Sequence, residues 1–287
     1  MRLPTGRLRN LLLKLNLKEM KLIQTAERVS ETDKSDNCIY QRSLFSYLEA
    51  AKLIHGNVLE IGTGSGYGIE YIAQNSTKFI TIDKHRPTTL SNETLICSDQ
   101  VRFLKMKVPP LLNVPDNYFD FVISFQVIEH IKDDSAFIQE AYRVLKPGGR
   151  LILTTPNIKT SLTRNPWHIR EYTIAELEVR LKGCFSTINK LGVYGNEKVQ
   201  DYTAKNKAAI QKITRFDIFN LQYKLPRQLL TVPYDLLNRL NRQNLLKSNE
   251  ELTTGIRTSD YYLDVAKEDC LDLFYVAVKG GLSSTNS

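Results

Sequence analysis

The sequence contains no apolar run that approaches the roughly 20 residues required by a membrane-spanning helix. Its four cysteines, Cys38, Cys97, Cys184 and Cys270, are widely scattered and form no C-x-x-C pair. This spacing indicates neither a zinc site nor a disulfide framework, so we expect no metal site and a reducing compartment. Lys14 interrupts the leucine-rich start before it could form the apolar core of a signal peptide. These absences favour a cytoplasmic protein.

Internal repeats and low-complexity segments are also missing, which excludes solenoids and long disordered regions. The chain has 287 residues, of which 42% are hydrophobic and 24% charged. A chain of this length and composition can bury one large core and still carry an appendage. We therefore expect one globular domain with an insertion.

Basic residues are unevenly distributed, although the formal net charge is only +8. Residues 1–21 contain six Lys or Arg against one acid, and residues 196–250 contain ten against five. The remainder of the chain is close to neutral. The basic character therefore belongs to two appendages.

The N-terminal appendage has leucines at helical spacing, with basic side chains on another face of the same helix. The leucines are Leu8, Leu11, Leu12, Leu15 and Leu22. This pattern predicts an amphipathic helix, which either packs on the core with solvated lysines or lies on a membrane surface. A mitochondrial presequence is a third reading.

The middle of the chain alternates short apolar runs with helical patterns. The predicted strands are "NVLEIG", "KFITID", "FDFVISF" and "GRLILTTPN", and the predicted helices include "IEYIAQ" and a helix over about Asp134–Leu145 that stops at the Gly148-Gly149 pair. Strands and helices in this rhythm form a parallel sheet with helices on both faces. The expected fold is therefore α/β, a doubly wound, mostly parallel sheet whose ligands bind at the carboxyl ends of the strands.

Further sequence signals locate the last helix and the last two strands of this domain. Thr173 and Glu176 form a capping-box pair that opens a helix ending at Gly183. The strand "CFSTINKLGVYG" follows, and its partner "CLDLFYVAVKGG" comes about 70 residues later, too far for a structureless loop in a compact domain. We expect a basic helical arm at 1–37, a core at 38–195, a helical insertion or lid at 196–262, and the last strand with a disordered tail at 263–287.

One turn has a glycine at every second position directly after an apolar run, in "VLEIGTGSGYG". Glycine is needed where the backbone adopts a positive φ or where a ligand comes closer than a Cβ allows. The dinucleotide fingerprint G-x-G-x-x-G fails, because Tyr67 and Ile69 occupy the sixth position in the two possible registers. A nicotinamide or flavin cofactor is therefore disfavoured.

The acid and glycines of this turn, Glu60, Gly62, Gly64 and Gly66, resemble the first motif of the class I S-adenosylmethionine-dependent methyltransferases. The physical chemistry suits that cofactor. Its ammonium favours a nearby carboxylate, and its carboxylate favours backbone N–H groups at a helix start. Bare glycines also let the chain pass close to the sulfur and the ribose.

Later segments extend the resemblance. "FDFVISFQVIEHIKDD" and "FIQEAYRVLKPGGRLILTTPN" are similar to the fourth strand, the following helix and the fifth strand of small-molecule methyltransferases, which include the quinone-biosynthesis enzymes. "NPWHIREYT" resembles bacterial members of that group. The resemblance covers about residues 38–195 and the last strand, and leaves out the arm and the insertion.

The resemblance implies a set of cofactor contacts. Glu60 is expected to hold the ammonium, and Asp83, at the end of the second strand, to accept hydrogen bonds from the ribose hydroxyls. Family members carry an acid after the third strand that contacts adenine, whereas this chain has Lys105, Met106 and Lys107, so adenine would be held by apolar packing and backbone groups. The full expected set is Glu60, Gly62, Thr63, Gly64, Gly66, Tyr67, Asp83, Lys84, Met106 and Gln126.

His130 and His168 are the candidate catalytic residues, because imidazole can take a proton from a hydroxyl near neutral pH. The alternative for both is a structural role. Trp167, the only tryptophan, either lies beside an aromatic or extended acceptor or simply anchors its loop.

The resemblance implies in-line methyl transfer to a small-molecule or lipid-linked acceptor, with oxygen as the expected methylated atom. Basic residues around the site favour anionic or membrane-surface acceptors, reached by peripheral contact through the basic arm. An RNA methyltransferase is an alternative, but the D/N/S-P-P-aromatic motif of base-amino methylation is replaced by "SFQV". A second alternative is a non-catalytic module that binds the cofactor without turnover. The sequence leaves the oligomeric state open.

Overall fold

The computed structural model describes residues 27, 29–87, 99–215 and 221–281. The amphipathic helix predicted around Leu8–Leu22 lies outside these residues. Within them, no helix is both long enough and apolar enough to cross a membrane.

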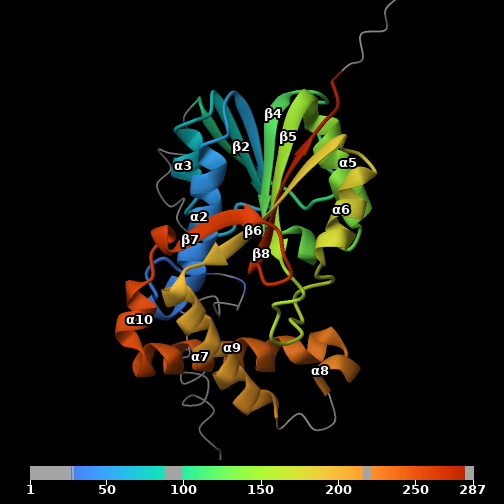
Figure 1. Ribbon diagram of the computed structural model, residues 1–287. Helices are drawn as coiled ribbons and strands as arrows, with labels where there is room; N and C mark the ends of the chain where they lie inside the picture. Colours follow the sequence, from blue (N-terminus) through green and yellow to red (C-terminus); the bar gives the residue numbers. More distant parts are fainter. Residues whose placement is uncertain (1–26, 28, 88–98, 216–220, 282–287) are drawn as a thin grey trace, which may run out of the picture.

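The core of the molecule is one mixed sheet with the strand order β3-β2-β1-β4-β5-β8-β6-β7 (Figure 1). Strands β1 to β5 are parallel, and β8 runs antiparallel to both β5 and β6. The bounds are β1 Asn57–Ile61, β2 Lys78–Asp83, β3 Val101–Lys105, β4 Phe119–Phe125, β5 Leu145–Pro156, β6 Thr187–Gly195, β7 Tyr261–Val265 and β8 Asp272–Val278.

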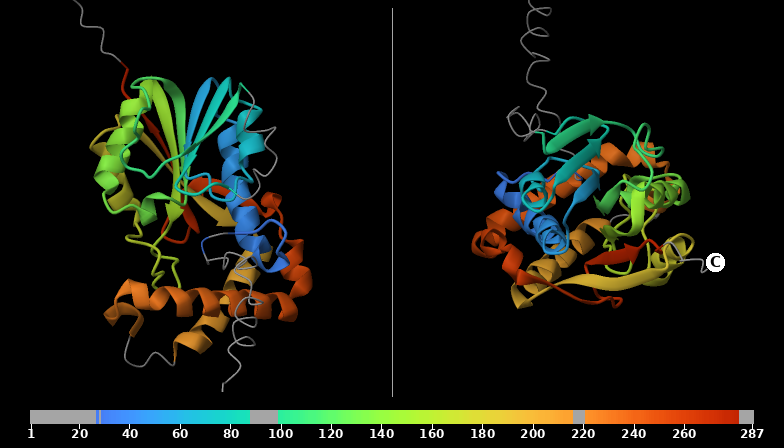
Figure 2. Two further views of the ribbon diagram at one scale, coloured as in Figure 1. Left: turned by 180° about the vertical axis from the view of Figure 1, so that it is seen from behind. Right: turned by 90° about the horizontal axis from the view of Figure 1, so that it is seen from above.

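Apolar side chains on both faces of the central strands explain why these segments form a buried sheet. Strands β1 and β4 are buried along almost their whole length, as expected for a parallel sheet that is covered on both sides. Helices α2 (Asn37–Ala51) and α3 (Ile69–Ala73) pack on one face, and α5 (Asp134–Val144) and α6 (Ile174–Lys182) on the other (Figures 1 and 2). The expected doubly wound α/β fold is confirmed.

Local signals in the sequence match the structure closely, with one correction. The capping box of Thr173 and Glu176 opens α6, and Gly183 caps its end. The Gly148-Gly149 pair, however, does not stop the preceding helix, which ends at Val144. Gly148 instead lies inside β5 with a φ of +80°, where the ladder with β4 is irregular. A left-handed glycine marks a local irregularity in a strand as well as the end of a helix, so the sequence alone does not distinguish the two.

Four helices follow β6 and cross the carboxyl ends of the strands (Figures 1 and 2). They are α7 (Glu197–Thr214), α8 (Leu221–Lys224), α9 (Arg227–Ser248) and α10 (Glu250–Gly255), and we call them the lid helices. The chain then returns as β7, which pairs antiparallel with β6 at the edge of the sheet. This strand was not predicted from the sequence, because only its pairing with β6 distinguishes it from a loop.

A cluster of charges fixes α9 to the start of the core. Asp36, which is fully buried, accepts hydrogen bonds from Arg242 at 3.0 Å and from Arg239 at 3.2 Å. Arg239 also contacts Asp33 at 2.9 Å. The lid helices are thus attached to the core through buried ion pairs as well as apolar contacts.

Candidate cofactor and acceptor site

A cavity of about 1320 Å³ lies between the carboxyl ends of the strands, helix α2 and the lid helices. It exceeds the roughly 300–1,000 Å³ of a typical small-molecule site, so it offers room for a cofactor and a second molecule. Most of the site residues expected from the sequence line it: Gly62, Thr63, Gly64, Tyr67, Asp83, Lys84, Met106, Gln126, His130 and His168.

The glycine turn after β1 has the backbone that its sequence predicts. Gly62, Gly64 and Gly66 adopt φ values of +99°, +57° and +89°. A Cβ on Gly62 would lie 2.2 Å from a methyl of Val127, whereas a Cβ on Gly64 would meet nothing within 4 Å. Gly62 is therefore required by packing within the protein, and Gly64 leaves open space on the cavity side.

Asp83 ends β2 at the mouth of this turn. Its Oδ2 accepts a hydrogen bond from the Gly64 N–H at 3.0 Å, and its Oδ1 accepts one from the His85 N–H at 2.8 Å. These backbone donors hold the carboxylate at the cavity wall. Each oxygen retains a lone pair, so the group can still accept a ligand hydroxyl.

Glu60 is placed differently from the other expected cofactor residues. Its side chain is 1% exposed and accepts hydrogen bonds from the hydroxyls of Tyr47, at 2.6 Å, and Thr81. Neither Glu60 nor Gly66 is among the described residues that line the cavity. Burial raises the pKa of Glu60 to about 7, so near neutral pH its charge responds to any positive group that binds nearby.

Gln126 follows β4 with a φ of +56°, a conformation that is costly for a residue with a side chain. Its N–H donates to the carbonyl of Thr154 on β5 at 3.0 Å, which maintains this conformation. The same turn carries Val127 against Gly62. The ends of β1, β4 and β5 are thus locked together where the cavity begins.

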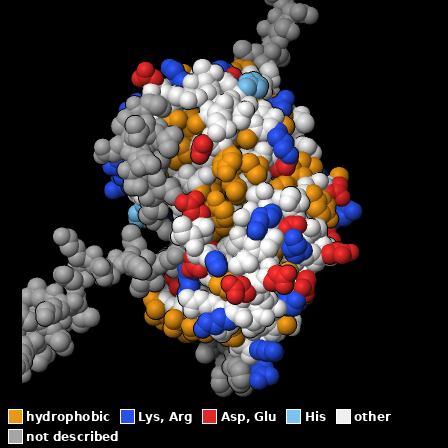
Figure 3. All heavy atoms as spheres, turned by 90° about the vertical axis from the view of Figure 1, so that its left-hand side faces the viewer, with side chains coloured by type: hydrophobic (Ala, Val, Ile, Leu, Met, Phe, Trp, Pro, Cys, Tyr) orange, Lys and Arg blue, Asp and Glu red, His pale blue; other side chains and the backbone are white. Residues whose placement is uncertain are grey.

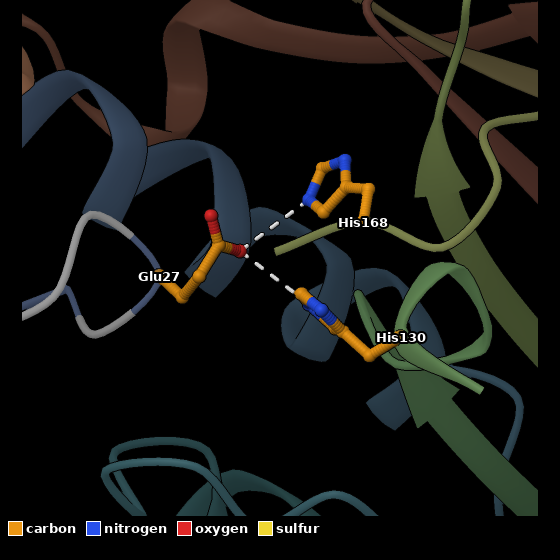
Figure 4. A group of neighbouring side chains, drawn as sticks. All are labelled: Glu27, His130 and His168. Atoms are coloured by element: carbon orange, nitrogen blue, oxygen red, sulfur yellow. Dashed lines mark hydrogen bonds and ion pairs between the residues drawn. The ribbon is translucent and has the colours of Figure 1, made fainter. Parts of the chain in front are cut away.

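His130 and His168 lie side by side on the far side of the cavity, with ring centroids 5.0 Å apart. Glu27 lies between them: its Oε2 is 3.4 Å from Nε2 of each histidine (Figure 4). The second nitrogen of each ring is also engaged, because Nδ1 of His130 is 3.0 Å from the Trp167 carbonyl and Nδ1 of His168 is 2.7 Å from Glu171.

This arrangement changes the expected charge of the histidines. Burial lowers the pKa of His168, but its hydrogen bonds to Glu171 and Glu27 outweigh burial and raise that pKa to about 10. Burial is likewise outweighed at His130, where the hydrogen bond to Glu27 raises the pKa. Imidazoles that already carry a proton stabilise a negative oxygen better than they accept a proton.

The loop that carries His168 is fixed at several points. The carbonyl of Glu129 accepts hydrogen bonds from the N–H groups of Ile169 and Arg170. Trp167 donates from its indole to Asp235 of α9 at 3.0 Å. Arg227, also of α9, donates to the carbonyl of His168 at 3.0 Å. The lid helices therefore help to position the histidine cluster.

Sequence reasoning missed several residues of the site. Glu27 carries no motif and lies far from both histidines along the chain. Glu171 lies within "NPWHIREYT", three residues after His168, but it was not singled out from the sequence. Tyr47 lies on α2, whose apolar residues at helical spacing, such as Leu44, Phe45 and Tyr47, could have predicted the helix but not the contact with Glu60.

A parallel sheet with a reversed last strand, and a glycine turn and an acid at the ends of its first two strands, define the class I methyltransferase fold. The family model described as "Methyltransferase domain" matches residues 59–153. A probable S-adenosylmethionine-dependent methyltransferase of Mycolicibacterium smegmatis is 30% identical over 266 residues, which span 89% of this chain and 94% of that protein. The chain belongs to the S-adenosylmethionine-dependent methyltransferases.

Two further comparisons agree with this assignment. A ubiquinone biosynthesis O-methyltransferase of Pseudomonas putida is 30% identical over 120 residues, covering 41% of this chain and 49% of that protein. The fold matches the crystal structure of a methyltransferase of Thermotoga maritima, titled a possible histamine N-methyltransferase, with a TM-score of 0.50 and 16% identity, over 84% of this chain and 91% of that one. The chain is therefore a methyltransferase enzyme. The match to the ubiquinone enzyme spans less than half of either protein.

S-adenosylmethionine is therefore the cofactor, and the residues present fit it. The open side of Gly64 admits close approach to the backbone, and the Asp83 carboxylate faces the same part of the cavity. The backbone of Thr63 and Gly64, the side chain of Asp83 and the apolar surface of Met106 would hold the cofactor. When bound, it supplies an activated methyl group.

We expect cofactor affinity to rise with pH because of Glu60. Its pKa of about 7 in the free protein would fall when a positive ligand binds nearby, so binding would release a proton. Affinity should then rise with pH up to about pH 7 and level off above about pH 8. The total gain is about tenfold for each unit by which the pKa of Glu60 falls on binding. Calorimetric titration with S-adenosylmethionine at several pH values measures this.

The Glu60→Gln variant is the control, since it keeps the shape of the side chain and removes its titration. Both proteins share every other titrating group, including the ammonium of the ligand. The difference between their pH profiles therefore belongs to Glu60. Parallel profiles would show that this carboxylate does not interact with the cofactor.

Proposed function

We propose that the enzyme transfers the methyl group to a hydroxyl oxygen of a small-molecule or lipid-linked acceptor. The observation that supports this most directly is the continuity of one cavity, which extends from Gly64 and Asp83 to His130 and His168. The cofactor would occupy the glycine end. The acceptor would lie at the histidine end, with its oxygen near the imidazoles.

The reaction forms an O–CH₃ bond, breaks the C–S bond of the sulfonium, and releases the hydroxyl proton. Because the leaving group is neutral and the methyl group already activated, alignment and exclusion of water can supply much of the rate. The lid helices close the cavity with Tyr234, Asn238 and Asn241 of α9. His130 and His168 would stabilise the oxygen as it loses its proton, a role that suits their raised pKa values.

The outer face of α9 supports a lipid-linked acceptor. Leu229, Val232 and Leu236 lie at helical spacing and are 64%, 75% and 59% exposed, while Tyr234 and Asn238 of the same helix face the cavity. A helix with an apolar outer stripe can lie in a membrane interface. The basic N-terminal arm would add attraction to anionic lipids at the cytoplasmic surface, as would Lys224 at the end of α8 and Arg227 at the start of α9.

The comparison with the ubiquinone biosynthesis O-methyltransferase also supports the proposal, because the name of that enzyme gives an oxygen acceptor and a lipid-like product.

The surface charge bears on RNA as an alternative acceptor. On the face shown in Figure 3, basic and acidic side chains of the described residues are interspersed. A nucleic-acid-binding face usually carries clustered basic residues. This face therefore lacks the charge pattern expected of an RNA-binding surface.

The test is incubation with S-adenosylmethionine that carries a ¹³C-labelled methyl group and fractionated lipid, small-molecule and RNA extracts. We expect a methoxy carbon in the lipid fraction. A variant with Leu229→Asn, Val232→Asn and Leu236→Asn should still methylate detergent-dispersed lipid but label vesicle-embedded acceptor much more slowly. Label on nitrogen or carbon, or in RNA, would contradict the proposal. Equal rates of the two proteins on vesicles would remove the role of α9.

A further inference from the structure

The cluster of Glu27, His130 and His168 has the arrangement of a metal site. One ligand atom from each residue lies within 4.8 Å of the others, and both Nε2 atoms point at the same carboxylate oxygen from 3.4 Å (Figure 4). Two donors bound to one tetrahedral ion at about 2.0–2.1 Å are themselves about 3.3 Å apart. The two distances from Glu27 to the histidines are therefore close to those of a bound state.

The outer contacts of the two rings fix their orientation. The Trp167 carbonyl and the Glu171 carboxylate can only accept a hydrogen bond, so Nδ1 of His130 and Nδ1 of His168 carry the hydrogen atoms. In the neutral ring, Nε2 then carries the lone pair. Hydrogen bonds from Nδ1 to a carbonyl or carboxylate are the usual support of metal-ligating histidines.

An ion that binds the Nε2 lone pairs of both rings must also balance the carboxylates around the cluster. Glu27 and Glu171 contact the rings directly, and the buried Glu129 precedes His130 in the chain. Thr155 donates to one carboxylate oxygen of Glu129, while the other, Oε1, has no hydrogen-bond partner among the described residues. Buried carboxylates are stable when they are paired or when a metal ion compensates their charge.

We propose that Glu27, His130 and His168 bind one divalent ion of the first transition series, such as Zn²⁺, Co²⁺ or Mn²⁺. Two imidazole nitrogens and one carboxylate oxygen suit these ions better than Mg²⁺ or Ca²⁺, which prefer oxygen ligands only. Nδ2 of Asn165 lies 2.7 Å from Glu27 and 2.8 Å from Nε2 of His168. This amide would move aside when the ion binds.

Three protein ligands leave coordination positions open toward the cavity, as in catalytic metal sites. A hydroxyl oxygen of the acceptor can occupy such a position, where the positive ion takes over the role of the protonated imidazoles and lowers the cost of losing the hydroxyl proton. This role of the ion depends on the proposed function, whereas the binding of the ion does not.

The test uses the full, tag-free chain after treatment with a chelator. Calorimetric titration with ZnCl₂ should give one ion per chain, and CoCl₂ should produce the visible absorption bands of a site with few ligands. Glu27→Gln, His130→Ala and His168→Ala should each remove stoichiometric binding. Glu171→Gln, which changes only an outer contact, should weaken binding by about 10- to 100-fold. His55→Ala removes a histidine outside the cluster and should bind like the unaltered protein.

Circular dichroism and titration with adenosylhomocysteine separate this proposal from the proposed function. All variants should keep their helix content and their affinity for adenosylhomocysteine, because the cluster lies at the other end of the cavity. No stoichiometric ion in the unaltered chain, or equal binding by His168→Ala, would overturn the site and leave a metal-free Glu–His ion pair. Methyl transfer at an unchanged rate in the presence of a chelator would overturn only the role of the ion in catalysis.

Discussion

Replacing Gly64 with alanine is expected to weaken the binding of adenosylhomocysteine by at least about 100-fold, or about 2.7 kcal/mol. The residue has a φ of +57°, and an added Cβ would meet no protein atom within 4 Å. Because Gly64 lines the cavity, the methyl group would occupy the space that the cofactor needs. Its N–H also holds Asp83, so a shift of the turn would move the expected ribose acceptor. Calorimetric titration measures the loss.

Gly148→Ala is the matched control for backbone strain. Gly148 has a φ of +80°, its added Cβ would also meet nothing within 4 Å, and it does not line the cavity. Both variants should lose about 1–2 kcal/mol of stability from the left-handed conformation. Only Gly64→Ala should lose affinity. If both variants bind adenosylhomocysteine as tightly as the unaltered protein, the glycine turn is not where the cofactor lies.

Replacing Asp36 with alanine is expected to lower the free energy of unfolding by about 3–5 kcal/mol, the usual cost of breaking a buried ion pair. The carboxylate is fully buried and accepts hydrogen bonds from Arg239, Arg242 and the Ser30 N–H. Without it, two guanidinium groups on the inner face of α9 would lose this partner. Denaturant unfolding measures the global effect, and hydrogen exchange of α9 would show whether the lid helices open first.

The control is Asp201→Ala on α7, another lid helix. Asp201 pairs with Lys205 one turn later at 2.5 Å, and both side chains are about half exposed. Such a surface pair contributes about 0.3–0.5 kcal/mol, so the control should unfold almost like the unaltered protein. A loss of similar size in both variants would mean that the cluster around Asp36 does not anchor α9.

The histidine cluster shows how much of the site sequence motifs can predict. The sequence indicated His130 and His168 as the candidate catalytic residues, because imidazole can accept a proton near neutral pH. It could not predict that Glu27 lies between them, or that Trp167 and Glu171 engage their other nitrogens. These contacts join segments up to 141 residues apart, and no local pattern encodes such a separation.

Glu60 belongs to a motif, yet the motif did not predict its contacts or its charge. The resemblance identified the acid and suggested a direct contact with the ammonium, but the structure places Tyr47 and Thr81 on its carboxylate. Tyr47 reaches Glu60 only because α2 packs against the first strand. The identity of the group was evident from its spacing to the glycines, whereas its charge near neutral pH depends on burial.

The sequence by itself determined strands β1, β2, β4, β5, β6 and β8 and helices α3, α5 and α6 of the core. It also determined the positive φ of the glycine turn and the placement of Asp83 at the sheet's ligand edge. Hydrophobic periodicity, capping pairs and glycine act over a few residues, so they are visible in a short window. The tertiary structure alone decided the pairing of β7, the docking of α9 through Asp36, the burial of Glu60 and the meeting of Glu27 with two histidines. Each of these depends on which distant side chains the sheet topology brings together, and that is a property of the whole fold.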